Sequence, residues 1–209
     1  MHQTATPTPR RAAGIVLLTT AAILCVDHYR TLVAPPILDD LLLYAVVPLL
    51  VIVGLLRRNP LDYGLRAGRW REGLAWTAGG VALMAAVGWL FMQLPAFGLY
   101  YADYFAFRNP GGEVWAGIAL SGVQMAAWEF LFRGFLLFAL AEAFGADAIG
   151  LQMLPFALAH FGKPEWETYA SIPGGLLAGW IAYRVGAFWP AWLIHWALAI
   201  TMQVLMGGL

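Results

Sequence analysis

The segment AAWEFLFRGF, residues 126–135, places two charged side chains in one of the most apolar stretches of the chain. Glu129 and Arg133 are four residues apart, so on a helix they share one face and can form an ion pair. A charge at the centre of a membrane helix costs about 2.5–3.5 kcal/mol on insertion scales, and such groups usually face the bundle interior and have a function. We therefore interpret the pair as the centre of a site. The alternative is a buried ion pair that only fixes helix packing.

The composition around this segment is typical of an integral membrane protein. Of the 209 residues, 61% are hydrophobic and 11% are charged, whereas a soluble domain is about 25% charged. The mean hydropathy of +0.70 agrees. Twelve basic and twelve acidic residues balance, so the net charge gives no indication of nucleic-acid or acidic partners, and we expect no nucleic-acid partner. The single cysteine, Cys25, excludes an internal disulfide and a cysteine-cluster metal site.

Apolar segments recur along the whole chain, and a spanning helix needs about 20 such residues. They lie near residues 13–33, 38–57, 72–94, 113–143, 147–161, 170–185 and 188–207. We predict an all-α fold, a polytopic transmembrane helix bundle of roughly seven spans embedded in the lipid bilayer.

The chain divides into a cytoplasmic tail (1–12), N-terminal spans and loops (13–112) and a core that carries the site (113–209). The first apolar run has no clear small-residue cleavage site after it, so we interpret it as a retained span rather than a signal peptide. Five arginines between Arg57 and Arg71 favour the cytoplasmic side. The stretch 95–112 is then expected to be an outer loop. The predicted location is multi-pass, in the bacterial inner membrane.

Two histidines in other apolar segments complete a candidate catalytic set with Glu129. His160 ends the run QMLPFALAH, and His195 lies within AFWPAWLIHWALAI. Each alone is typical of a packing histidine, but three spans could bring all three groups together. A glutamate can take a proton from water, and a histidine can stabilise an oxyanion or assist the proton transfer. Such a set is sufficient in principle for peptide hydrolysis.

The same two histidines and Glu129 could instead hold zinc, because His₂Glu is a known catalytic zinc set. No HExxH helix is present, so we favour a mechanism without a cofactor.

Glu165 and Glu167 follow His160 in a segment that we expect to be a loop.

The order and spacing of these motifs resemble the CPBP family, which comprises the CAAX proteases and bacteriocin-processing (Abi) enzymes related to the CAAX prenyl endopeptidase. The family pattern is EExxxR, FxxxH and HxxxN or HxxxD on three successive helices. WEFLFR (128–133) matches the first motif except for its first Glu, FALAH (156–160) matches the second, and HWALA (195–199) matches the third only in its histidine. NPLDYGLRAGRW (59–70) is similar to the loop that precedes the family's core.

The resemblance implies a glutamate-dependent intramembrane protease, often classified as a metalloprotease. Two departures concern its site. Trp128 stands where the family has the Glu assigned as the water-activating base, and Ala199 stands where it has the oxyanion-site Asn or Asp. We favour Glu129 itself as the base, held by Arg133. The alternative within the same activity is that Glu165 or Glu167 replaces the missing acid.

The expected substrate is a membrane-proximal or transmembrane segment of another protein or peptide. A second hypothesis is a catalytically inactive membrane protein of the same fold, acting in binding, maturation or immunity. A third is a small transporter with Glu129 as a proton relay, although no inverted repeat is evident.

Overall fold

The computed structural model describes residues 6–109 and 111–207, and these residues form helices and connecting segments without a strand. Residues 1–5 of the predicted tail therefore lie outside the described part. The helices are α1 (Pro9–Tyr29), α2 (Pro36–Leu41), α3 (Val47–Leu50), α4 (Trp70–Met92), α5 (Pro95–Arg108), α6 (Val114–Glu129), α7 (Leu137–Phe144), α8 (Ala148–Leu158), α9 (Glu165–Val185) and α10 (Trp189–Gly207). The prediction of an all-α bundle is confirmed.

Short helical segments of other pitch complete the chain. Within the part of the chain that the structure describes, three are π-helical (Leu42–Val46, Val51–Leu56 and Phe130–Leu136) and two are 3₁₀ turns (Pro60–Tyr63 and Gly145–Asp147). As a result α2 and α3 belong to one helical run, and α6 continues through its π segment into α7.

Among the described residues, five stretches are long and apolar enough to cross a membrane: Pro9–Tyr29, Pro36–Leu56, Trp70–Met92, Val114–Leu158 and Trp189–Met206. The sequence predicted roughly seven spans. The two segments expected near 113–143 and 147–161 fall within one of these stretches, and the segment near 170–185 lies in α9. Glu165, Glu167 and Arg184 reduce the apolar character of α9.

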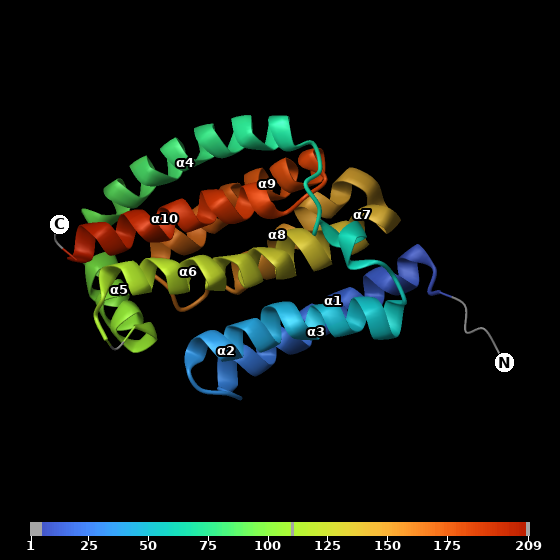
Figure 1. Cartoon of the computed structure of the whole chain (residues 1–209), viewed down its shortest axis with the longest axis horizontal. Coiled ribbons are helices and arrows are strands. Elements are labelled where there is room, and N and C mark those ends of the chain that lie inside the picture. Colours follow the sequence, from blue (N-terminus) through green and yellow to red (C-terminus); the bar gives the residue numbers. More distant parts are fainter. Residues whose placement is uncertain (1–5, 110, 208–209) are drawn as a thin grey trace.

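The helices pack in layers, which Figure 1 shows from the side. α1 lies beside the α2–α3 run, and this pair packs against α6 and α7. α10 lies between α6 and α4, while α8 and α9 pack together behind it. The largest cluster of buried apolar residues includes the π segment after α6, so Glu129 and Arg133 lie next to this core.

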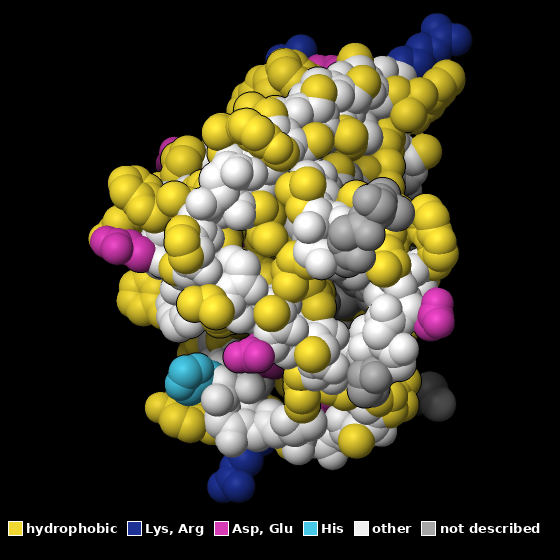
Figure 2. Space-filling view, turned by 90° about the vertical axis from the view of Figure 1, so that its left-hand side faces the viewer, with side chains coloured by type: hydrophobic (Ala, Val, Ile, Leu, Met, Phe, Trp, Pro, Cys, Tyr) yellow, Lys and Arg dark blue, Asp and Glu magenta, His cyan; other side chains and the backbone are white. Residues whose placement is uncertain are grey.

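The outer surface is rich in exposed apolar side chains, as lipid contact requires. Leu18, Leu50, Leu99 and Trp115 are each exposed by 65% or more. Figure 2 shows hydrophobic side chains spread over the end of the molecule that carries α5, with basic groups at the margins of the view. The exposed apolar side chains along the helices fit the membrane location predicted from composition.

Two sequence expectations about loops are wrong. Residues 95–112 were expected to form a loop, but α5 occupies most of them. Pro95 starts this helix, and proline is favoured at a first helical position because its missing N–H has no partner there anyway. Glu165 and Glu167, also expected in a loop, form the first turn of α9, where acidic side chains are stabilised by the helix dipole.

Candidate active site

Glu129 and Arg133 form the predicted ion pair in the interior of the bundle. Arg133 Nη1 donates to Glu129 Oε1 over 2.9 Å, and each side chain is 1% exposed. The pair spans the junction where α6 passes into its π-helical segment. π-Helical turns inside α-helices are rare and frequently occur at functional sites.

Two further contacts hold the Arg133 guanidinium in place. It stacks on the ring of Phe156, with 3.8 Å between the guanidinium carbon and the ring centroid. Its Nη2 also approaches the carbonyl oxygen of Gly175 at 3.5 Å. This close approach of α9 depends on small residues, because a Cβ on Gly175 would meet the Phe156 ring at 2.9 Å.

His195 contacts the same carboxylate from α10. Its Nδ1 lies 2.7 Å from Glu129 Oε1. The same oxygen therefore forms hydrogen bonds with both His195 and Arg133. Glu129 Oε2 is buried and has no hydrogen-bond partner within the described residues. The structure thus brings together Glu129, Arg133 and His195, which the sequence proposed as one set.

His160 is held by the residue that begins its motif. Its Nδ1 lies 2.8 Å from the carbonyl oxygen of Phe156, four residues earlier. A carbonyl oxygen can only accept, so Nδ1 carries the proton and Nε2 of the neutral ring presents a lone pair. The Phe156 backbone carbonyl thus orients His160, and its ring contacts Arg133. The four-residue spacing between Phe and His in FALAH places the histidine ring next to that carbonyl.

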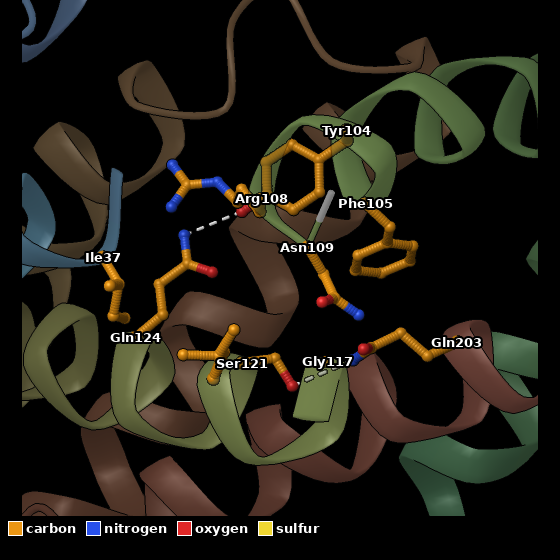
Figure 3. Close-up of a pocket in the computed structure, with 10 residues that line it drawn as sticks. Ile37, Tyr104, Phe105, Arg108, Asn109, Gly117, Ser121, Gln124 and Gln203 are labelled. Atoms are coloured by element: carbon orange, nitrogen blue, oxygen red, sulfur yellow. Dashed lines mark hydrogen bonds between the residues drawn. The ribbon is translucent and has the colours of Figure 1, made fainter. Parts of the chain in front are cut away.

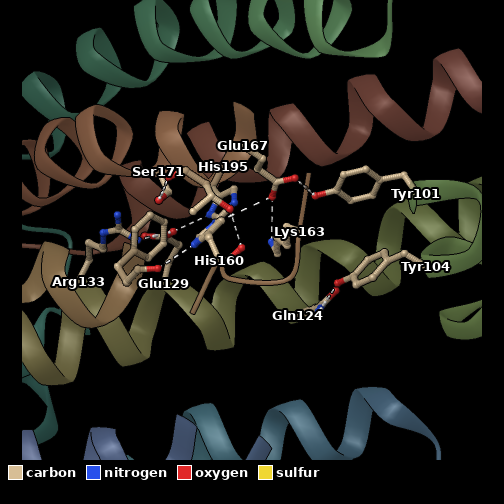
Figure 4. Close-up of polar contacts among 12 residues, drawn as sticks. Tyr101, Tyr104, Gln124, Glu129, Arg133, His160, Lys163, Glu167, Ser171 and His195 are labelled. Atoms are coloured by element: carbon tan, nitrogen blue, oxygen red, sulfur yellow. Dashed lines mark hydrogen bonds and ion pairs between the residues drawn. The ribbon is translucent and has the colours of Figure 1, made fainter. Parts of the chain in front are cut away.

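Glu167 approaches the free nitrogen of His160 from α9, with 4.0 Å between Glu167 Oε1 and His160 Nε2 (Figure 4). Lys163 Nζ donates to the same carboxylate oxygen over 2.9 Å. The Tyr101 hydroxyl, from α5, donates to the other oxygen over 2.6 Å. By contrast, Glu165 is exposed and accepts a hydrogen bond from Tyr169, so the structure keeps it out of the cluster.

One cavity of about 290 Å³ joins these groups. Its polar wall contains both carboxylates, Arg133, Ser171 and both histidines. Its other walls are apolar side chains of α4, α9 and α10, such as Leu83, Ile181 and Ile194. A peptide substrate bound in this cavity would contact apolar side chains on most sides. On the polar side it would contact the carboxylates and histidines.

The comparison with protein-family models bears on this same part of the chain. Residues 110–201 match the Type II CAAX prenyl endopeptidase Rce1-like family. The resemblance predicted from the motifs is confirmed over this stretch, which contains Glu129, Arg133, His160, Glu167 and His195. The match supports a membrane protease role. No curated protein and no solved structure matches the chain.

Within the Rce1-like stretch, the two departures from the family pattern have structural consequences. The Trp128 ring packs edge-on against His160 at 6.0 Å between centroids and against Tyr44 at 5.1 Å. It therefore fills space beside His160 with an apolar ring. Ala199 lies one turn after His195, and its methyl group can donate no hydrogen bond to an oxyanion.

The Rce1-like stretch offers no ready metal site. Within residues 6–109 and 111–207, no group of three or more His, Cys, Asp or Glu side chains is close enough to hold a metal ion. The zinc alternative required Glu129, His160 and His195 to act as one ligand set. No such grouping of these three residues is found in the described part of the chain.

A second cavity is smaller and lies between α5, α6 and α10 (Figure 3). Its volume of about 20 Å³ suits a single water. Gln124 donates to Tyr104 beside it, and Gln203 donates to Ser121. These hydrogen bonds join α5 to α6 and α6 to α10, so we interpret the cavity as part of the packing near the site.

Tyr101 and Lys163 are not among the site residues predicted from the sequence. Lys163 lies four residues before Glu167 but ahead of the first residue of α9, so helical spacing does not indicate this pair. Tyr101 reaches the site from α5, 66 residues away in the chain, so no local pattern indicates it either.

Proposed function

We propose that this protein is an intramembrane endopeptidase that hydrolyses peptide bonds in membrane-associated proteins or peptides. The observation that supports this proposal best is the convergence of two carboxylates and two histidines on one largely apolar cavity. Amide hydrolysis needs a base for the water, a donor for the oxyanion and an acid for the leaving amine. The cavity wall carries residue types for all three tasks.

His195 and Glu129 suit the second task, donation to the oxyanion. When both ring nitrogens of His195 are protonated, Nδ1–H donates to Glu129 and Nε2–H is free to donate to a developing oxyanion. The buried carboxylate stabilises that imidazolium, as an acidic partner does in other hydrolases. Arg133 in turn fixes Glu129. Glu129 as the water-activating base stays a prediction from the sequence, and Glu167 is the competing carboxylate.

The substrate proposal follows from the apolar walls of the cavity. A soluble loop would lose hydration of its polar side chains in such a place, whereas an apolar segment from the bilayer would not. We therefore propose a membrane-proximal or transmembrane segment as substrate, cleaved in the native cell membrane. The inactive-protein and transporter hypotheses predict no proteolysis, so they are separated from this proposal by experiment.

A comparison of protein termini in the native host tests the activity. In a deletion strain, a set of new N-termini in membrane proteins should vanish, and the wild-type gene should restore them. The measurement is mass spectrometry of labelled N-termini in membrane fractions. If no terminus changes between the two strains, the endopeptidase proposal fails and the inactive-protein hypothesis is favoured.

Metal dependence is tested with the purified protein in detergent. We expect EDTA or 1,10-phenanthroline to leave the cleavage rate within about twofold of the untreated rate, because the water would be activated by a carboxylate. The probe is a synthetic peptide that spans one of the termini lost in the deletion strain. Loss of activity with the chelator and its recovery with added zinc would overturn the metal-free mechanism.

A further inference from the structure

We infer that Glu167 is the base that takes the proton from the attacking water, together with His160, and that Lys163 and Tyr101 position it. This inference rests on the proposed endopeptidase function and assigns a chemical step within it. Its starting point is the 4.0 Å separation between Glu167 Oε1 and His160 Nε2 at the cavity wall (Figure 4).

The two facing atoms are suited to share one water molecule. Because His160 Nδ1 donates to Phe156, its Nε2 is an acceptor in the neutral ring. Glu167 Oε1 is also an acceptor, and its second lone pair is free beside the bond from Lys163. A water at about 2.8 Å from each acceptor can bridge this separation and donate one proton to each. Its own lone pairs then point away from both and are free to attack a carbonyl carbon.

Glu129 is less well placed for this step. Its Oε1 already forms hydrogen bonds with both Arg133 and His195, and its Oε2 is buried in the protein. Among the described residues, Glu167 is the carboxylate that approaches the ring of His160. Each carboxylate thus contacts a different histidine. Glu129 contacts His195, and Glu167 faces His160.

The position of Trp128 explains why the base would come from another helix. The indole ring lies against His160 on the α6 side, where it leaves an apolar surface. Glu167 reaches His160 from α9. A carboxylate is therefore restored beside His160 although residue 128 provides none.

The connection between α8 and α9 fixes the distance between the two groups. The carbonyl oxygen of His160 accepts from the Lys163 backbone N–H over 3.2 Å and from the Thr168 hydroxyl over 2.8 Å. These bonds tie the first turn of α9 to His160. Lys163 and Tyr101 then hold one Glu167 oxygen each. The cluster combines residues of α5, of α9 and of the segment between α8 and α9, so it is more than a local ion pair within one turn.

The chemical step balances without any further reactant. Glu167 takes one proton from the water as the water oxygen bonds to the scissile carbonyl carbon, and the carbonyl oxygen becomes an oxyanion that accepts from His195 Nε2. The C–N bond then breaks, and the proton held by Glu167 passes to the leaving amine. One water is consumed, and a carboxyl group and an amine are formed.

The test compares Glu167→Gln with Glu165→Gln, which removes a carboxylate two residues away on the exposed side of the same helical turn. With the synthetic peptide defined above, Glu167→Gln should lower kcat by about 10²- to 10⁴-fold, the usual contribution of a general base, with little change in KM. Glu165→Gln should stay within about twofold of wild type. A Glu167→Gln rate within about threefold of wild type would overturn the inference while leaving the endopeptidase function standing.

A second variant covers the case in which Glu167→Gln does not accumulate. Tyr101→Phe keeps the ring and removes only the hydrogen bond to Glu167. We expect kcat to fall by about tenfold or more, as loss of a hydrogen bond to a charged group implies, with KM unchanged. An unchanged kcat in Tyr101→Phe would count against the positioning role. If wild type cleaves nothing, the proposed function itself fails, which is a different outcome from either result above.

Discussion

Arg133→Met should lower the free energy of unfolding by about 3–5 kcal/mol, the largest stability effect that we expect from a single substitution in this chain. Removing one partner of a buried ion pair leaves the other charge without compensation, and that cost is of this size. Here the remaining charge would be Glu129, which is 1% exposed and would keep only its contact with His195. The measurement is unfolding of the detergent-solubilised protein in denaturant, followed by circular dichroism.

A double variant separates this cause from simple loss of packing. Arg133 also stacks on Phe156, so Arg133→Met loses some contact as well as charge. If the unpaired carboxylate causes the loss, Glu129→Gln combined with Arg133→Met should be more stable than Arg133→Met alone. Equal stability of the single and double variants would show that the stacking, and not the charge, was responsible.

Glu129→Gln should abolish most cleavage while the protein still accumulates. The amide has nearly the shape of the carboxylate but no charge to stabilise a protonated His195. For a comparable acid that holds a histidine in a serine protease, the loss is about 10⁴-fold in kcat. In the native host, the termini that vanish in the deletion strain should vanish in this strain too, with the protein level checked by immunoblotting.

The outcomes for Glu129→Gln and Glu167→Gln together assign the roles of the two carboxylates. Loss of cleavage in both variants fits a site in which Glu129 holds His195 and Glu167 activates the water. Loss only in Glu129→Gln would favour Glu129 as the base, as the sequence first suggested. Wild-type termini in the Glu129→Gln strain would contradict both mechanisms.

If Glu167 acts as proposed, the carboxylate that activates the water can be lost at one position of the family motif and supplied by another helix. The carboxylate that the family pattern places at residue 128 and the one at Glu167 come from different helices, α6 and α9. What the reaction requires is an acceptor near His160 Nε2, and not a particular place in the chain. A substitute for the missing acid is therefore found among the side chains near His160 in the folded structure, and not at a fixed position in the sequence.

The sequence by itself determined the bundle and most of the candidate site. Long apolar stretches can satisfy their backbone in a membrane only as helices, so the all-α fold followed from composition. The Glu129–Arg133 pair also followed, because residues four apart on a helix are neighbours. The motifs around His160 and His195 then indicated a family resemblance, which the family-model match confirmed over residues 110–201.

Only the tertiary structure decided which acid faces which histidine. Glu165 and Glu167 look equivalent in the sequence, yet the start of α9 turns one to the surface and the other toward His160. Tyr101 joins the site because α5 is a helix at the end of the bundle where α9 begins, and no local pattern carries that information. Contacts between segments far apart in the chain depend on how helices pack, and packing is a property of the whole fold.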